Sequence, residues 1–192
     1  MSNQDITTVY LAADHRGVGL KLYLYEMLMA DGYHVVDLGT NDLNTPVDFP
    51  DIAKKLADEM LDDSQSRGIL ICGTGAGMEI AANRYRHIRA SRCERPEQAR
   101  DDRFHDDINV LTLAADDIDI EIAFLCAQSF LESPFDNCEK RIRRIEKISK
   151  KKRPAKCGVF FTQLFYFCLC INQHLILQFS GFHKIINIWQ LF

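Results

Sequence analysis

The sequence lacks a signal peptide, in which a basic segment precedes an apolar one, because it opens on the polar segment MSNQDITT. This absence predicts a cytoplasmic protein. Its seven cysteines lack the paired spacing of metal ligands, and Cys168 and Cys170 form only a C-x-C pair. We therefore expect reduced thiols, with neither a disulfide framework nor a metal site. The formal net charge of −4 does not suggest a nucleic-acid partner.

Two nucleotide-binding motifs are also missing. A dinucleotide fingerprint needs G-x-G-x-x-G in the first turn between a strand and a helix, with an acidic residue after the second strand. Here the glycines read G-x-G-x-G and follow the third predicted strand, at residues 73–77. A P-loop is excluded because no Gly-Lys-Ser/Thr follows these glycines.

Acidic residues are absent from residues 151–192, which hold five of the 23 Lys and Arg, so the tail carries +5 and residues 1–150 carry −9. We expect a domain at 1–150 and a basic, then apolar extension at 151–192. KKKRPAK precedes an apolar stretch about as long as a membrane span. The extension is a membrane or partner-binding tail, a packed extra helix, or a segment without selected structure, which the abrupt change of composition favours. Membrane contact follows only from the first alternative.

Strand-like and helix-like segments alternate through the first 150 residues, a rhythm that predicts an α/β fold. We expect a Rossmann-like three-layer domain, in which a five-stranded parallel sheet is flanked by helices. The predicted strands are 8–12, 34–37, 67–71, 88–91 and 109–113. The predicted helices are 18–30, 49–61, 77–84, 96–104, 118–131 and 137–150.

Residues suited to chemistry follow three of these strands. Asp14-His15-Arg16-Gly17 follows the first strand, Cys72-Gly73-Thr74-Gly75-Ala76-Gly77 the third, and Cys93-Glu94-Arg95 the fourth. Because the predicted strands are parallel, these segments are expected at one edge of the sheet, at the carboxyl ends of the strands. Ligands of such sheets bind at that edge. A glycine-rich turn before a helix typically holds an anion, because its backbone N–H groups are free.

Several motifs in order resemble the sugar-phosphate isomerases of the ribose-5-phosphate isomerase B type, which include the galactose-6-phosphate isomerase subunits. They are ADHRG at 13–17 with Lys21, VDFPD at 47–51, ICGTGAG at 71–77, AAN at 81–83, IRA at 88–90 and HDDINVL at 105–111. The resemblance implies an aldose–ketose isomerase that interconverts ribose 5-phosphate and ribulose 5-phosphate through an enediolate, without metal or organic cofactor. It also implies a homodimer with sites between the subunits.

The resemblance makes Cys72 the catalytic thiol that moves a proton between C1 and C2. The glycine loop would stabilise a thiolate and hold the enediolate oxygens, with the Thr74 hydroxyl as a further donor. Gly73, Gly75 and Gly77 would let the backbone approach the substrate closely. The alternative is that Cys72 is a small buried apolar residue.

Two histidines receive roles from the resemblance as well. The position of His105 opens the furanose ring, and the position of His15 helps to bind phosphate. We expect the two to converge on one edge of the sheet. Asp14 would bind sugar hydroxyls, or else cap a turn.

The chain departs from the family at its phosphate-binding positions. Lys140, Arg141 and Arg144 of the last helix remain as cations, but Asp106 stands where the family commonly has Asn, and Asp116 where it commonly has Arg. A carboxylate near a dianion is repulsive, so we expect Asp116 to weaken phosphate binding. Two alternatives therefore stay open: a non-catalytic sugar-phosphate-binding relative, and an isomerase of another aldose phosphate.

Overall fold

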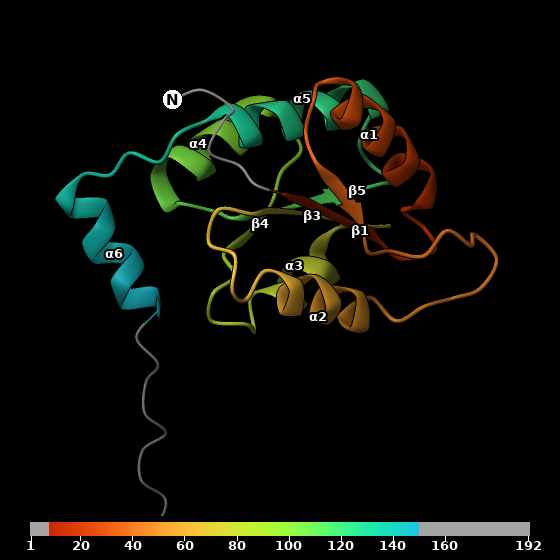
Figure 1. Ribbon diagram of the computed structural model, residues 1–192, viewed down its shortest axis with the longest axis horizontal. Helices are drawn as coiled ribbons and strands as arrows, with labels where there is room; N and C mark the ends of the chain where they lie inside the picture. The colour runs from red at the N-terminus through yellow and green to blue at the C-terminus, as the bar shows by residue number, and fades with distance from the viewer. Residues whose placement is uncertain (1–7, 150–192) are drawn as a thin grey trace, which may run out of the picture. The chain divides into compact units, whose positions relative to one another are not determined.

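The computed structural model describes residues 8–149, which form a five-stranded parallel sheet with helices on both faces (Figure 1). The strands are β1 (Val9–Ala13), β2 (Val35–Asp37), β3 (Arg67–Cys72), β4 (Ala90–Arg92) and β5 (Val110–Ala114), in the order β2-β1-β3-β5-β4. The helices are α1 (Val18–Ala30), α2 (Phe49–Glu59), α3 (Ala76–Ala82), α4 (Pro96–Asp106), α5 (Ile120–Glu132) and α6 (Glu139–Ser149). The predicted Rossmann-like fold is confirmed, and the predicted elements agree with the observed ones to within a few residues.

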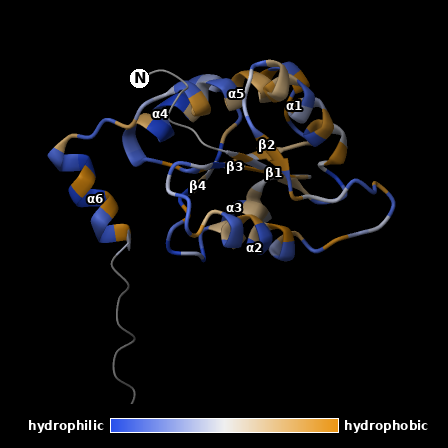
Figure 2. Ribbon diagram, viewed as in Figure 1, coloured by the Kyte–Doolittle hydropathy of each residue, from blue (hydrophilic) through white to orange (hydrophobic). Residues whose placement is uncertain are grey.

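The inner strands are buried on both faces, which explains their largely apolar sequences. In β3 every residue after Arg67 is buried, and in β5 all residues are. Because side chains alternate along a strand, Ile69 and Ile71 join the core under α1, α4 and α5, whereas Leu70 and Cys72 join the core over α2 and α3. Figure 2 shows the apolar centre of the sheet between these two helical layers.

A buried lysine fixes the end of β2 against α1. Lys21 is fully buried, and its Nζ contacts the Asp37 carboxylate at 2.8 and 2.6 Å, the Thr40 carbonyl at 2.8 Å and Asn41 Oδ1 at 2.5 Å. A buried ammonium is tolerated only when it is paired and hydrogen-bonded. Lys21 therefore anchors the start of the loop that leads from β2 to α2.

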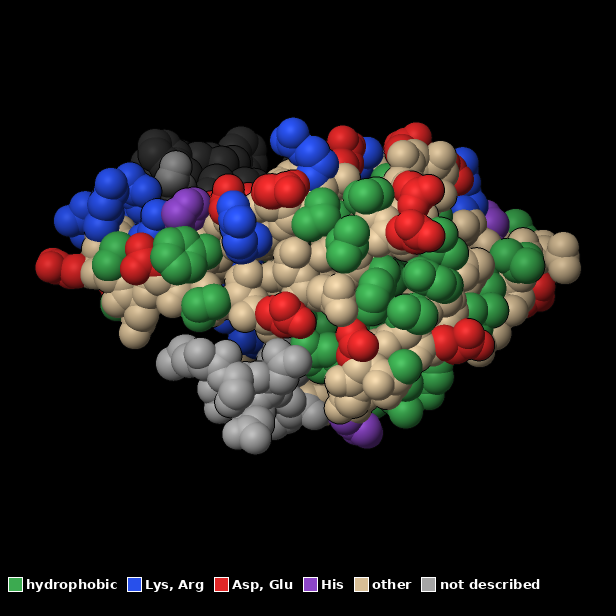
Figure 3. Space-filling view, turned by 90° about the horizontal axis from the view of Figure 1, so that it is seen from above, with side chains coloured by type: hydrophobic (Ala, Val, Ile, Leu, Met, Phe, Trp, Pro, Cys, Tyr) green, Lys and Arg blue, Asp and Glu red, His purple; other side chains and the backbone are tan. Residues whose placement is uncertain are grey.

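Helix α6 contacts α4 and has no buried residue, and Ile142 and Ile148 lie on its exposed surface. Figure 3 looks onto the face formed by α1, α4 and α5, where apolar side chains gather among charged ones. Within residues 8–149, no helix combines the length and the hydropathy that crossing a membrane requires. The extension predicted at 151–192 lies outside the described residues.

Candidate active site

The glycine loop after β3 turns back onto the thiol of Cys72. Cys72 ends β3 and is 5% exposed, and the backbone N–H of Gly75 donates a hydrogen bond to its Sγ at 3.1 Å. Gly75 has φ +74°, a conformation that side chains disfavour, and a Cβ there would lie 3.0 Å from Arg92 Cδ. The loop thus places a fixed N–H donor on the sulfur at the carboxyl edge of the sheet.

Two other cysteines show what an ordinary buried thiol looks like in this chain. Burial, and then the nearby Asp102 carboxylate, raise the pKa of the Cys93 thiol. Burial, and then Glu97, raise the pKa of the Cys126 thiol to about 11. Neither sits in a glycine loop. Cys72 differs because a backbone N–H, the kind of donor that suits a thiolate, points at its sulfur.

The turn after β1 brings Asp14 and His15 to the same edge. Asp14 is 5% exposed, and its Oδ1 accepts hydrogen bonds from the N–H groups of Arg16 at 2.9 Å and Gly17 at 3.2 Å. That carboxylate oxygen therefore holds the turn, as the alternative reading of Asp14 supposed. His15 Nδ1 accepts a hydrogen bond from Val47 N–H at 3.4 Å, which ties the ring to the loop that precedes α2.

The other loop residues lie where the sequence predicts. Thr74 is exposed, and Gly77 lies in the first turn of α3, against the ring of Phe49. A Cβ on Gly73 would lie 2.6 Å from Cζ of Arg16 and 2.7 Å from Oδ2 of Asp116. The backbone at Gly73 is therefore in close contact with two charged side chains, from the turns that follow β1 and β5.

Asp116 is not an isolated acid at this edge. Its Oδ2 forms an ion pair with Arg16 Nη2, and its N–H donates to the Gly73 carbonyl at 3.0 Å. Arg92, at the end of β4, forms ion pairs with Glu94 at 2.7 Å and Asp117 at 3.5 Å. Sequence reasoning named neither arginine as a site residue. The signal for Arg16 was its place directly after His15 in the DHRG motif.

The expectation that His15 and His105 converge on one edge is wrong within a single chain. His105 lies near the end of α4, which returns along the sheet and ends just before β5 begins. Its side chain is therefore at the amino edge, whereas His15 and Cys72 lie at the carboxyl edge. Asp106 follows it, and in α6 Lys140 and Arg144 are exposed.

Arg141 joins α6 to the end of α4. Its Nε pairs with Asp136 at 2.9 Å, its Nη1 donates to the His105 carbonyl at 3.3 Å, and its guanidinium lies 6.0 Å from the centre of the Phe104 ring. The hydrogen bond from Arg141 lowers the pKa of Asp136. Arg141 is thus engaged in structure, which leaves Lys140 and Arg144 as the exposed candidates for phosphate.

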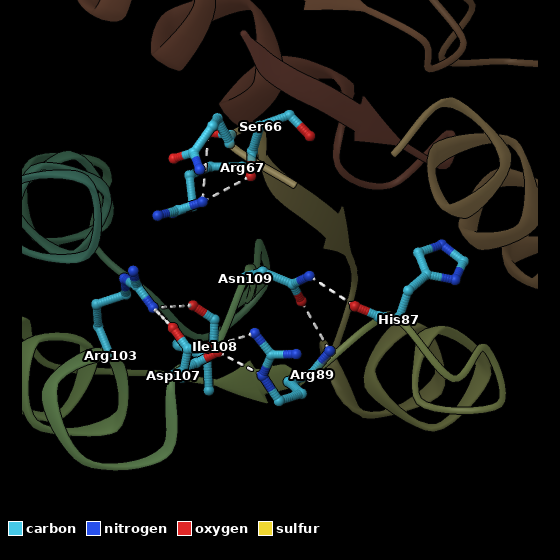
Figure 4. A network of polar contacts seen from close by, with 9 residues as sticks. Ser66, Arg67, His87, Arg89, Arg103, Asp107, Ile108 and Asn109 are labelled. Carbon is cyan, nitrogen blue, oxygen red and sulfur yellow. Dashed lines mark hydrogen bonds and ion pairs between the residues drawn. The ribbon is translucent and has the colours of Figure 1, made fainter. Parts of the chain in front are cut away.

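A network of arginines holds the turn from α4 into β5 (Figure 4). Asp107, with φ +51°, forms ion pairs with Arg103 and, at 2.7 Å, with Arg89. The backbone N–H of Arg89 donates to Asn109 Oδ1 at 2.7 Å, and Asn109 Nδ2 donates to the His87 carbonyl at 2.7 Å. This network fixes the segment that carries His105 and Asp106.

The described residues contain no cluster of three or more His, Cys, Asp or Glu side chains that could hold a metal ion.

Comparisons with known proteins identify the family. The model of the ribose/galactose isomerase family matches residues 9–148. A putative sugar phosphate isomerase of Rickettsia conorii is 41% identical over 128 residues, 67% of this chain and 88% of that one. Ribose-5-phosphate isomerase B of Escherichia coli is 32% identical over 146 residues, 75% of this chain and 97% of that one.

Solved structures agree. A ribose 5-phosphate isomerase from Thermotoga maritima is 43% identical with a TM-score of 0.71, over 74% of this chain and 97% of that one. Ribose-5-phosphate isomerase B from Mycoplasma genitalium, solved with bound ribulose-5-phosphate, is 35% identical with a TM-score of 0.71, over 74% of this chain and 93% of that one. The chain belongs to the ribose/galactose isomerase family.

Proposed function

We propose that this protein is an aldose–ketose isomerase that interconverts ribose 5-phosphate and ribulose 5-phosphate. The observation that carries the proposal is the thiol of Cys72, which lies at the carboxyl edge of the sheet with the Gly75 N–H directed at its sulfur. The family match and the relatives named ribose-5-phosphate isomerase supply the substrate class.

In the proposed reaction the Cys72 thiolate takes the proton from C2 of the open-chain aldose. The C–H electron pair becomes the C1–C2 double bond, and the carbonyl electrons move onto O1, which gives an enediolate. The thiol then returns its proton to C1, while a proton passes from O2 to O1 and C2 becomes the carbonyl carbon. Backbone N–H groups of the loop and the Thr74 hydroxyl are the donors for the oxygen that becomes negative.

Ring opening needs a second acid–base group, for which His105 is the candidate. It would take the proton of the anomeric hydroxyl as the bond between C1 and the ring oxygen breaks, and would pass that proton to the ring oxygen. Since His105 and Cys72 lie at opposite edges of the sheet in one chain, a site that contains both needs residues of two chains. We therefore propose a homodimer in which His105 and Asp106 of one copy face the Cys72 loop of the other.

Helix α6 supports this arrangement. It has no buried residue, and the side chains of Ile142 and Ile148 are 38% and 70% exposed. A second copy would cover such an apolar stripe. The same contact would bring the exposed cations of α6, Lys140 and Arg144, towards the phosphate of a sugar bound at the partner's loop, together with His15 of that loop's own chain.

We also propose that the protein acts in the cytoplasm. The proposed substrate is a phosphorylated sugar. The described cysteines are free thiols, the state that a reducing compartment maintains: Cys72, Cys93, Cys126 and Cys138.

The test is the Cys72→Ala variant, assayed with ribose 5-phosphate against hexose 6-phosphates. Because it removes the positioned base, kcat should fall by at least roughly a thousandfold. Cys126→Ala removes an equally buried thiol outside the loop and should leave kcat within about twofold. Turnover by Cys72→Ala at the wild-type rate would contradict the proposal. A higher kcat/KM of the wild-type protein for a hexose 6-phosphate than for ribose 5-phosphate would show that the hexose 6-phosphate is the preferred substrate.

A further inference from the structure

Arginine side chains that the proposed reaction does not use flank the Cys72 loop on both sides. Arg16 comes from the turn after β1 and Arg92 from the end of β4. Since the strand order is β2-β1-β3-β5-β4, Arg16 approaches the loop of β3 from one side, and the carboxylates after β5 from the other. The Cys72 loop therefore has its own charged rim, independent of α6.

Arg16 reaches across the loop. Its guanidinium lies against Gly73, the residue next to Cys72, and its Nη2 forms an ion pair with Asp116 on the far side. The contact spans three adjacent strands, β1, β3 and β5, at their carboxyl ends. Because Gly73 has no side chain, the guanidinium can lie against the backbone of the residue that follows Cys72.

Arg16 also keeps donors for a ligand. A guanidinium has five N–H groups, and within residues 8–149 the ion pair with Asp116 occupies Nη2 of Arg16. The side chain is 54% exposed, so the guanidinium is accessible to a ligand. Arg92 is less available, because it is 29% exposed, contacts two carboxylates and lays its stem over Gly75.

We infer that Arg16 is a ligand of the substrate's phosphate and that Asp116 is the residue that positions it. The inference rests on the proposed function, since it assumes a phosphorylated sugar next to Cys72. A planar guanidinium with adjacent free N–H groups binds phosphate oxygens in pairs, which a point charge such as Lys140 cannot do. Asp116 then serves phosphate binding instead of opposing it, because it holds the guanidinium over Gly73.

The first experiment compares Arg16→Ala with Arg100→Ala. Arg100 is a matched control, because its side chain is 58% exposed and paired with a single carboxylate, Asp101, but it lies on α4. Phosphate binding is shared by ground and transition states, so Arg16→Ala should raise KM for ribose 5-phosphate about tenfold or more and leave kcat within about twofold. Inorganic phosphate should inhibit Arg16→Ala about tenfold more weakly as well. Arg100→Ala should change none of these constants.

The second experiment removes the guanidinium of Arg16 and supplies another from the position of Asp116. Asp116 meets Arg16 directly above Gly73, so the double variant Arg16→Ala/Asp116→Arg places a guanidinium near the same point. It should recover much of the lost affinity for inorganic phosphate. Failure of the double variant to recover any affinity, in a protein that keeps kcat, would contradict the position assigned to the phosphate.

Failure of this inference can be told apart from failure of the proposed function. A wild-type protein without isomerase activity would refute the function, and calorimetric titration of wild type, Arg16→Ala and Arg100→Ala with inorganic phosphate would still test Arg16. Equal phosphate affinity in Arg16→Ala and Arg100→Ala would overturn the inference while the isomerase stands. A fall in kcat with unchanged KM would also overturn it, because Arg16 would then act on the reacting carbons.

Discussion

At the carboxyl edge of the sheet, glycines and backbone N–H groups position Cys72, whereas at the amino edge a network of side chains positions His105. The Cys72 loop owes its shape to the φ of +74° at Gly75 and to the bare backbone at Gly73. The turn after His105 depends on the carboxylate of Asp107, which two arginines share. Backbone conformation therefore shapes the first edge, and ion pairs hold the second together.

The difference shows in the arginines themselves. Burial, and then the like charge of Arg103, lower the pKa of Arg67 to about 10. Burial also lowers the pKa of Arg89. At the carboxyl edge, by contrast, the Arg16 side chain is more than half exposed. Burial thus works against the cations at the amino edge, and the Asp107 carboxylate that Arg89 and Arg103 share offsets this cost, whereas Arg16 at the carboxyl edge stays in contact with solvent.

The larger loss of stability is expected at the amino edge. Asp107→Asn keeps the shape of the side chain and tolerates the left-handed backbone, but leaves Arg89 and Arg103 without their carboxylate. Removing one partner of a buried ion pair is strongly destabilising, and because the Asp107 side chain is 25% exposed we expect a loss of roughly 3 kcal/mol in the free energy of unfolding. Denaturant unfolding measures it.

The control for this variant is Asp101→Asn, which breaks an exposed pair with Arg100 on the same helix. It should change the free energy of unfolding by less than about 0.5 kcal/mol. Similar losses in the two variants would show that the network at Asp107 has no special part in holding the amino edge.

A smaller loss of stability is expected at the carboxyl edge. In Gly75→Ala a side chain must adopt φ +74°, which costs about 1–2 kcal/mol, and its Cβ meets Arg92. Turnover should fall as well, since the N–H that contacts Cys72 is displaced. Gly32→Ala is the matched control: Gly32 has φ +88° with open space around it, so it should lose similar stability and keep full turnover. Equal turnover in both variants would show that the loop geometry is unimportant for the reaction.

The sequence was sufficient for features that depend on neighbouring residues. Short apolar runs that alternate with helix-like segments predicted the five strands, and the motif at 71–77 predicted a thiol beside a glycine loop. Even the start of α3 differs by only one residue, at Ala76 instead of Gly77. These features are local, so that spacing along the chain is enough to predict them.

Features that depend on strand order and on the direction of a helix were missed. Arg16 and Asp116 are 100 residues apart, and they meet only because β1 and β5 both lie beside β3. His105 was assigned to the wrong edge because it stands near a strand in the sequence, although a helix that precedes a parallel strand ends at that strand's amino end. The predicted roles of the site residues remain predictions, which the variants above would test.

In the proposed homodimer, a working site joins Cys72 of one chain to His105 of the other. The direct measurement mixes two variants, Cys72→Ala and His105→Asn, each of which alone should turn over ribose 5-phosphate at least roughly a hundredfold more slowly than wild type. In a hybrid dimer one site carries both substitutions and the other carries neither. After unfolding and refolding of an equimolar mixture, half of the dimers are hybrids, so activity should recover to about a quarter of the wild-type value. Activity that stays at the average of the two separate variants would contradict the claim.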